Sequence, residues 1–218
     1  HRGHQWQTDA MSTYRQRLRA KVAERGNLCV GIDPHGALLT AWGLPRTASG
    51  LERCARGIVA ALGEQVAVFK AQSAFFEAYG SAGISVLEKV LADIRDAGAL
   101  SILDAKRGDI GSTMEAYADA YLAETSPLRA DAVTLSPYLG FDSLAPGFVR
   151  AIENDRGVYV LARTSNPEGA HVQLALGQEG SVVQEIIDAA TALNKRAKTR
   201  AIGLVIAAFT PSPPTTKS

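Results

Sequence analysis

Six near-continuous apolar segments, rich in Val, Ile and Leu, recur along the chain at intervals of roughly 30 residues. They cover residues 28–33, 66–70, 100–106, 132–136, 157–162 and 202–208. Apolar runs of this length and composition are typical of parallel strands that are covered on both faces. The sequence therefore predicts six strands of one parallel sheet.

Segments between these runs show the spacing of amphipathic helices. Two groups of apolar residues fall at i, i+3, i+4 and i+7: Leu87, Val90, Leu91 and Ile94, and then Val183, Ile186, Ile187 and Ala190. Gly98 is a stop signal after the first group, and Ser181 with Gln184 predicts a capping box before the second. Strands that alternate with helices in this way indicate an α/β fold.

Polar residues gather where the predicted strands end, namely Asp33, Lys70, Asp104 with Lys106, Ser136, and Thr164 with Ser165. Both (β/α)8 barrels and doubly wound sheets place their chemistry at the carboxyl ends of strands. The chain has no Gly-x-Gly-x-x-Gly or Gly-x-x-x-x-Gly-Lys run after a strand, so a nucleotide-cofactor fold lacks its usual support. We therefore expect a (β/α)8 TIM barrel, with only about six of its eight strands evident.

The two ends of the chain differ from its middle. Residues 1–10 are polar and resemble a leader or tag, and residues 211–218 are rich in Pro and are expected to be disordered. Residues 11–210 are expected to form a single barrel domain, which looks cut short after its sixth strand.

Composition narrows the classes of function. The formal net charge of +1 argues against a nucleic-acid surface. The one dense basic run, Lys195, Arg196, Lys198 and Arg200, lies where a helix should end and suits the helix dipole. Two cysteines in 218 residues fit a reducing cytoplasm, and no apolar stretch is long enough to predict a transmembrane helix.

The strongest chemical signal lies at the end of the third predicted strand. The period of two in a strand puts Asp104 and Lys106 on one face with Leu100 and Ile102, which points two charges towards an interior. Buried charges are costly unless they are paired. Asp33 and Lys70 on neighbouring strands, with Asp109 beyond, would alternate acid and base and keep every member ionised.

The run from Asp104 to Thr113 resembles the Asp-x-Lys-x-x-Asp-Ile signature of the orotidine 5′-phosphate decarboxylase family. Other segments match in the same order: Gly31-Ile-Asp33, Phe69-Lys70, Ser136-Pro-Tyr138 and Thr164-Ser-Asn-Pro167. The run 71–79 is similar to the bacterial, mycobacterial-like branch of that family. The resemblance covers about residues 14 to 208.

The resemblance implies a metal-free and cofactor-free decarboxylation of orotidine 5′-monophosphate to UMP. Lys70, Asp104, Lys106 and Asp109 would form the catalytic tetrad, with Lys106 protonating C6 of the pyrimidine. Residues Asp33, Ile110, Thr113 and Ser165 would bind substrate. The enzyme would be a cytoplasmic homodimer in which Asp109 and Thr113 reach the partner's site, with no nucleic-acid or membrane partner.

Two alternatives stay open. A magnesium-dependent sugar-phosphate decarboxylase or aldolase of the same superfamily would share the Asp-x-Lys-x-x-Asp triplet, although in such enzymes the position of Lys70 looks to be a metal-binding Glu. A non-catalytic, truncated barrel is the second alternative. The resemblance also implies a phosphate-binding Gln and Arg, and no matching segments are found. A chain of these 218 residues alone is therefore expected to be a poor catalyst.

Overall fold

The computed structural model of the chain describes residues 13–177 and 180–208. The expected leader at residues 1–10 and the expected Pro-rich tail at residues 211–218 lie outside these ranges, as do the two boundaries of the expected barrel domain at 11 and 210.

Six parallel strands form one sheet in which each strand pairs with the next along the chain. They are β1 (Cys29–Ile32), β2 (Val68–Gln72), β3 (Leu100–Arg107), β4 (Ala132–Leu135), β5 (Gly157–Arg163) and β6 (Ile202–Ile206). All six predicted strands are present, so the predicted α/β class and strand count are confirmed. Because the strands follow one another without a change of direction, their carboxyl ends all meet at one rim.

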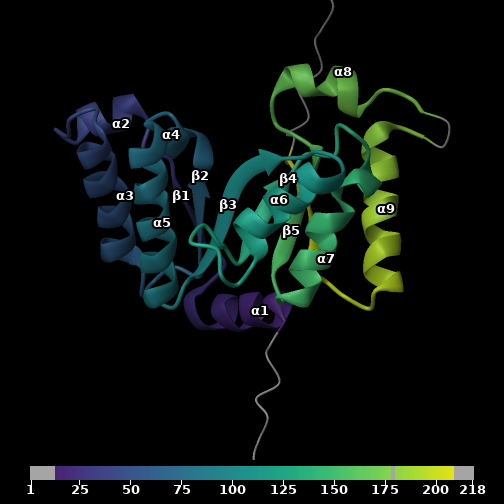
Figure 1. Ribbon diagram of the computed structural model, residues 1–218, viewed down its shortest axis with the longest axis horizontal. Coiled ribbons are helices and arrows are strands. Elements are labelled where there is room, and N and C mark those ends of the chain that lie inside the picture. Colours follow the sequence, from purple (N-terminus) through teal and green to yellow (C-terminus); the bar gives the residue numbers. More distant parts are fainter. Residues whose placement is uncertain (1–12, 178–179, 209–218) are drawn as a thin grey trace, which may run out of the picture.

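Helices cover the outer face of this sheet (Figure 1). The α-helices are α1 (Tyr14–Arg25), α2 (Gly36–Ala41), α3 (Ala48–Leu62), α4 (Ser73–Glu77), α5 (Gly80–Asp96), α6 (Gly111–Leu122), α7 (Ala145–Glu153), α8 (Ala170–Gln173) and α9 (Val182–Arg196), with 3-10 turns η1 (Phe141–Leu144) and η2 (Pro167–Gly169). In the described part of the chain, none of them has the length and apolar character needed to cross a lipid bilayer.

The main core lies between the outer face of the sheet and the helices. Alternate strand residues such as Phe69, Leu103 and Val133 point outwards and pack with buried residues of α3, α5, α6, α7 and α9. Helix α5 buries the group predicted from its spacing, and α9 buries Ile186 and Ala190. The two amphipathic helices predicted from the sequence are therefore confirmed.

Helix α1 lies across the end of the sheet at which the strands begin (Figure 1). Its Tyr14 packs on Val68, Leu100 and Ala132, the first inward-facing residues of three strands. The Tyr14 hydroxyl also lies 3.0 Å from that of Tyr159. The inner face of the sheet is thus apolar where the strands begin, and its polar side chains are left at the opposite rim.

Two predicted details differ from the structure. Strand β2 runs to Gln72 rather than ending at Lys70, because Ala71 and Gln72 continue the ladder beside β3. Ser181 caps α9 as predicted, since its hydroxyl accepts a hydrogen bond from the backbone N–H of Gln184. The Gln184 side chain, however, donates to Asp188 and does not complete a capping box.

Candidate active site

The Asp104 carboxylate is the centre of the polar rim. Lys70 and Gln72 from β2 donate to its Oδ2, each at 3.1 Å. Lys106 Nζ donates to Oδ1 at 2.7 Å, and the Thr134 hydroxyl from β4 donates to the same oxygen at 2.8 Å. A carboxylate has about four acceptor positions, so these four donors satisfy it completely.

The three charges differ in their access to solvent. The Asp104 side chain is only 8% exposed, whereas those of Lys70 and Lys106 are 33% and 46% exposed. Burial by itself raises the pKa of Asp104, but hydrogen bonds from Lys106 and Thr134 and the charge of Lys70 outweigh it and hold the pKa below its ordinary value. The site therefore presents two accessible ammonium groups on a buried carboxylate whose ionised form is favoured.

Lys106 owes its direction to an irregularity in β3. The pairing of β3 with β4 shifts between Leu103 and Arg107. Within this bulge Lys106 has φ +49°, a left-handed conformation that is unfavourable for a residue with a Cβ. The bulge turns the Lys106 side chain back over the carboxylate of Asp104, two residues earlier.

Asp33 follows the end of β1 at the same rim. Its Oδ1 is buried and has no hydrogen-bond partner among the described residues. A buried carboxylate oxygen without a donor is unfavourable, so a ligand that offers a hydroxyl or N–H group there would relieve the cost. Asp33 makes no ion pair with Lys70 in the described structure, so only Lys70, Asp104 and Lys106 of the expected alternating series are joined.

The other predicted site residues lie around the rim and more in solvent. Asp109 accepts a hydrogen bond from the Ile110 backbone N–H at 2.8 Å, and no ion pair in residues 13–177 or 180–208 joins it to either lysine. Ile110 is 62% exposed. Thr113, in the first turn of α6, and Ser165, after β5, are also exposed. Within one chain, these four residues do not approach the Asp104 cluster by any described contact.

Gln72 and Thr134 were not predicted. Both are uncharged polar residues of strands, and such residues do not break the pattern of a strand as Lys70, Asp104 and Lys106 do. The strand register places Gln72 directly beside Asp104 and brings Thr134 onto the inner face of β4. The period of two could have found Gln72, because Gln72 shares a face with Lys70, whereas Thr134 has no such signal in the sequence.

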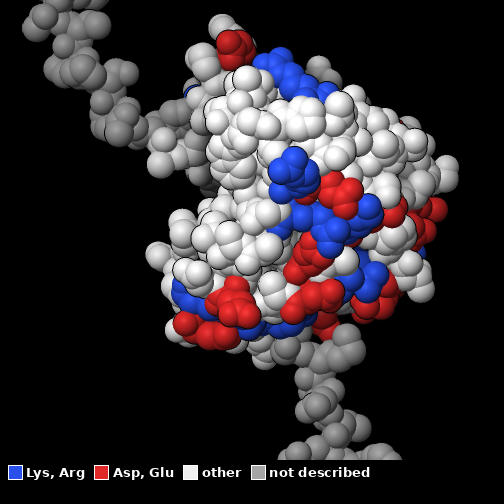
Figure 2. All heavy atoms as spheres, turned by 90° about the vertical axis from the view of Figure 1, so that its left-hand side faces the viewer, with Lys and Arg blue, Asp and Glu red and all other residues white. Residues whose placement is uncertain are grey.

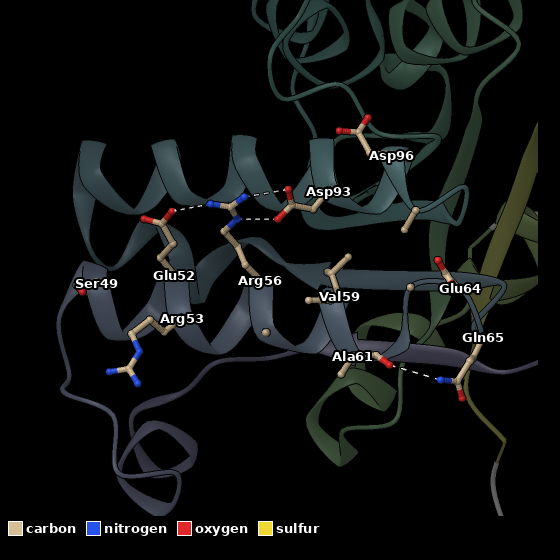
Figure 3. Close-up of a pocket in the computed structure, with 14 residues that line it drawn as sticks. Ser49, Glu52, Arg53, Arg56, Val59, Ala61, Glu64, Gln65, Asp93 and Asp96 are labelled. Atoms are coloured by element: carbon tan, nitrogen blue, oxygen red, sulfur yellow. Dashed lines mark hydrogen bonds and ion pairs between the residues drawn. The ribbon is translucent and has the colours of Figure 1, made fainter.

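A groove of about 750 Å³ between α3 and α5 is a different feature (Figure 3). Its Arg56 donates to Glu52 and to both oxygens of Asp93, so these charges are already paired. On the face shown in Figure 2, acidic and basic side chains are interspersed rather than separated by sign. The groove shares no residue with the Asp104 cluster and is a solvated ion-pair surface between outer helices.

Comparison with known proteins identifies relatives of this chain. A model of the orotidine 5′-phosphate decarboxylase / HUMPS family matches residues 26–216. The chain belongs to this family. It is 55% identical to the orotidine 5′-phosphate decarboxylase of Salinispora arenicola over 200 residues, covering 91% of this chain and 72% of that protein. Its identity to the orotidine 5′-phosphate decarboxylase of Corynebacterium glutamicum (strain R) is 49% over 207 residues, which cover 93% of this chain and 74% of that protein.

Solved structures of the family agree with the fold. A Streptomyces avermitilis protein, provisionally assigned as an orotidine 5′-phosphate decarboxylase, superposes with a TM-score of 0.90 at 49% identity, over 96% of this chain and 74% of that one. Leishmania donovani OMP decarboxylase superposes with a TM-score of 0.75 at 31% identity, over 92% of this chain and 72% of that one. The family predicted from the Asp104 motif is thus confirmed.

Proposed function

We propose that the chain catalyses decarboxylation of orotidine 5′-monophosphate to UMP in pyrimidine biosynthesis, without a metal or an organic cofactor. The Lys70–Asp104–Lys106 arrangement carries the proposal, because it offers an ammonium group held beside a buried carboxylate. Membership of the decarboxylase family, with relatives of that name about half identical to the chain, supports it.

The chemistry needs one bond broken and one formed. The bond between C6 and the substrate carboxylate breaks, CO₂ leaves, and the electron pair stays on C6. Lys106 Nζ, 46% exposed as a side chain, donates a proton to C6 and becomes neutral until solvent restores the proton. The ammonium groups also stabilise the negative charge that develops on the ring without having to move. Asp104 would hold the Lys106 ammonium group in place through their hydrogen bond and would repel the substrate carboxylate.

The remaining predicted residues bind substrate in this proposal. Asp33, whose buried Oδ1 lacks a partner, and Lys70 would contact ribose hydroxyls, and Ser165 would contact the pyrimidine ring. Asp109, Ile110 and Thr113 would act in the site of a second copy.

A symmetric homodimer would bring these last three residues into place. Apolar side chains that follow neighbouring strands support such an interface: Ile110, Tyr138 and Leu139 are 62%, 79% and 55% exposed. Residues 11–210 would form one barrel domain of each subunit, in the cytoplasm, where two free cysteines are in keeping with a reducing environment.

The direct test is turnover. Purified chain at high concentration should convert orotidine 5′-monophosphate to UMP with equimolar release of CO₂, and Lys106→Met should abolish release while retaining UMP binding. EDTA should leave the rate unchanged, because a protonated Lys70 cannot ligate a cation. Magnesium-dependent activity on a sugar phosphate would favour the sister enzymes, and UMP binding without any CO₂ release would favour a non-catalytic barrel.

Mixing two inactive variants tests the shared site. Lys106→Met and Asp109→Asn should each be inactive alone. In a mixed dimer, one of the two sites would combine an intact Lys106 with an intact Asp109, so the mixture should recover about a quarter of the wild-type rate. No recovery, with mixed dimers demonstrated by mass spectrometry, would contradict the placement of Asp109 across the interface.

A further inference from the structure

The backbone N–H of Lys106 is held by a side chain instead of by the sheet. The ladder between β3 and β4 is interrupted between Leu103 and Arg107, so residues 104–106 have no regular partners on β4. In place of a ladder bond, the Lys106 N–H donates to the Thr134 hydroxyl oxygen at 3.0 Å. A bulge at an active-site rim thus has its unpaired amide satisfied by one buried hydroxyl.

The same hydroxyl contacts the carboxylate that Lys106 contacts. Thr134 is 4% exposed, and its O–H donates to Asp104 Oδ1 at 2.8 Å while Lys106 Nζ donates to that oxygen at 2.7 Å. The Thr134 hydroxyl therefore contacts the backbone of Lys106 directly, and it is linked to the Lys106 ammonium group through Oδ1 of Asp104. The single donor of the hydroxyl and one of its two acceptor lone pairs are used within this closed ring.

We propose that Thr134 is a positioning residue that holds Lys106 in its left-handed conformation and so aims its ammonium group at the reacting carbon. The inference rests on the proposed function. A residue with a Cβ at φ +49° persists only when its surroundings fix it. Thr134 supplies that restraint, because loss of its hydroxyl would leave the Lys106 N–H unpaired and free the bulge to relax.

Removal of the Thr134 hydroxyl should displace Lys106 more than Asp104. Lys70 and Gln72 hold the other oxygen of Asp104 from β2, and these two bonds do not involve Thr134. Removal of the hydroxyl would therefore leave the carboxylate in place and loosen the lysine above it. Substrate binding, which the proposed function assigns to other residues, should change little.

The test compares Thr134→Val, which keeps the shape and removes the hydroxyl, with Thr134→Ser, which keeps the hydroxyl. Thr134→Val should lower kcat for orotidine 5′-monophosphate by about 10- to 100-fold, as expected for the loss of a hydrogen bond to a charged group, with KM within about 3-fold. Thr134→Ser should stay within about 3-fold of the wild-type kcat. A wild-type kcat in Thr134→Val, a parallel loss in both variants, or a change in KM alone would overturn the inference.

A second readout needs no substrate and so separates this inference from the proposed function. In the ligand-free protein, hydrogen exchange of the Lys106 amide, followed by NMR, should be at least about 10-fold faster in Thr134→Val than in wild type or Thr134→Ser. Unchanged exchange would overturn the positioning role even if turnover were confirmed. Thr134→Ala replaces the valine variant in both measurements if the latter fails to fold.

Discussion

Gly108 lies between Lys106 and Asp109 of the proposed catalytic set, in a position with no room for a side chain. A Cβ added there would lie 2.2 Å from the backbone oxygen of Ser136, which follows β4. That distance is more than 1 Å shorter than an ordinary van der Waals contact. The obstacle is backbone and cannot rotate away, so Gly108→Ala must push the β3–α6 connection off the end of β4.

The displacement should cost both stability and rate. The Ser136 N–H donates to the Arg107 oxygen at 2.8 Å, and this bond would be stretched or lost. Overpacking of this kind costs about 1–3 kcal/mol of unfolding free energy. Gly108 lies between Lys106 and Asp109, and a shift of about 1 Å in a positioned group lowers a rate by about 100-fold. Gly108→Ala should therefore lose about two orders of magnitude in kcat.

Two further glycines provide matched controls. A Cβ at Gly83, in α5, would lie 1.9 Å from the Phe76 oxygen, which is an equally severe overlap away from the Asp104 cluster. A Cβ at Gly57, within α3, would meet nothing within 4 Å. Gly83→Ala should destabilise without a specific loss of kcat, and Gly57→Ala should stabilise by about 0.5–1 kcal/mol.

The assay pairs urea unfolding with initial rates measured under conditions in which every variant is folded. The reasoning fails if Gly108→Ala retains the wild-type kcat, or if Gly83→Ala lowers kcat as much as Gly108→Ala does.

Two more predictions concern the ionised carboxylate and the loop after β5. The pKa of Asp104 is lowered in the native state, so its charge stabilises the fold above the ordinary carboxyl pKa of about 4, and this contribution is lost as pH falls through the native pKa. The difference in unfolding free energy between wild type and Asp104→Asn, measured by urea unfolding, should therefore shrink from pH 7 to pH 3. A difference that stays constant over this range would contradict the reasoning. In the loop after β5, the Gln173 side chain accepts hydrogen bonds from Arg163 and from the Thr164 N–H, and it donates one to the Thr164 hydroxyl. Gln173→Ala should raise KM several-fold, because Ser165 would be held less firmly, and should speed hydrogen exchange of the Thr164 amide. An unchanged exchange rate would show that other contacts hold the loop.

Most of the fold could be predicted because each strand is a near-continuous apolar run. The boundaries were less certain where polar residues continue a strand. Strand β2 extends past Lys70 because β3 offers backbone partners to Ala71 and Gln72, and those partners are remote in sequence. Such extensions depend on the neighbouring strand and cannot be found from a local pattern alone.

The charged part of the site could also be predicted, since Lys70, Asp104 and Lys106 violate the apolar pattern of their strands. Thr134 could not, because a threonine in a strand fits the pattern equally well on either face. The positive φ of Lys106 has no sequence signature either, since lysine is not a residue that favours that region. Asp109 and Thr113 stay predictions, because their expected role needs a second chain.

The left-handed backbone at Lys106 also affects how truncation of this lysine should be read. An alanine there would still place a Cβ in this unfavourable region while losing the ammonium contact with Asp104, so lost chemistry and any shift of the main chain would be measured together. Glycine accepts φ +49° without that penalty and leaves a gap that opens to the rim. Small primary amines added to a Lys106→Gly protein would enter an undistorted vacancy above Asp104, and this makes glycine the more informative host for chemical rescue.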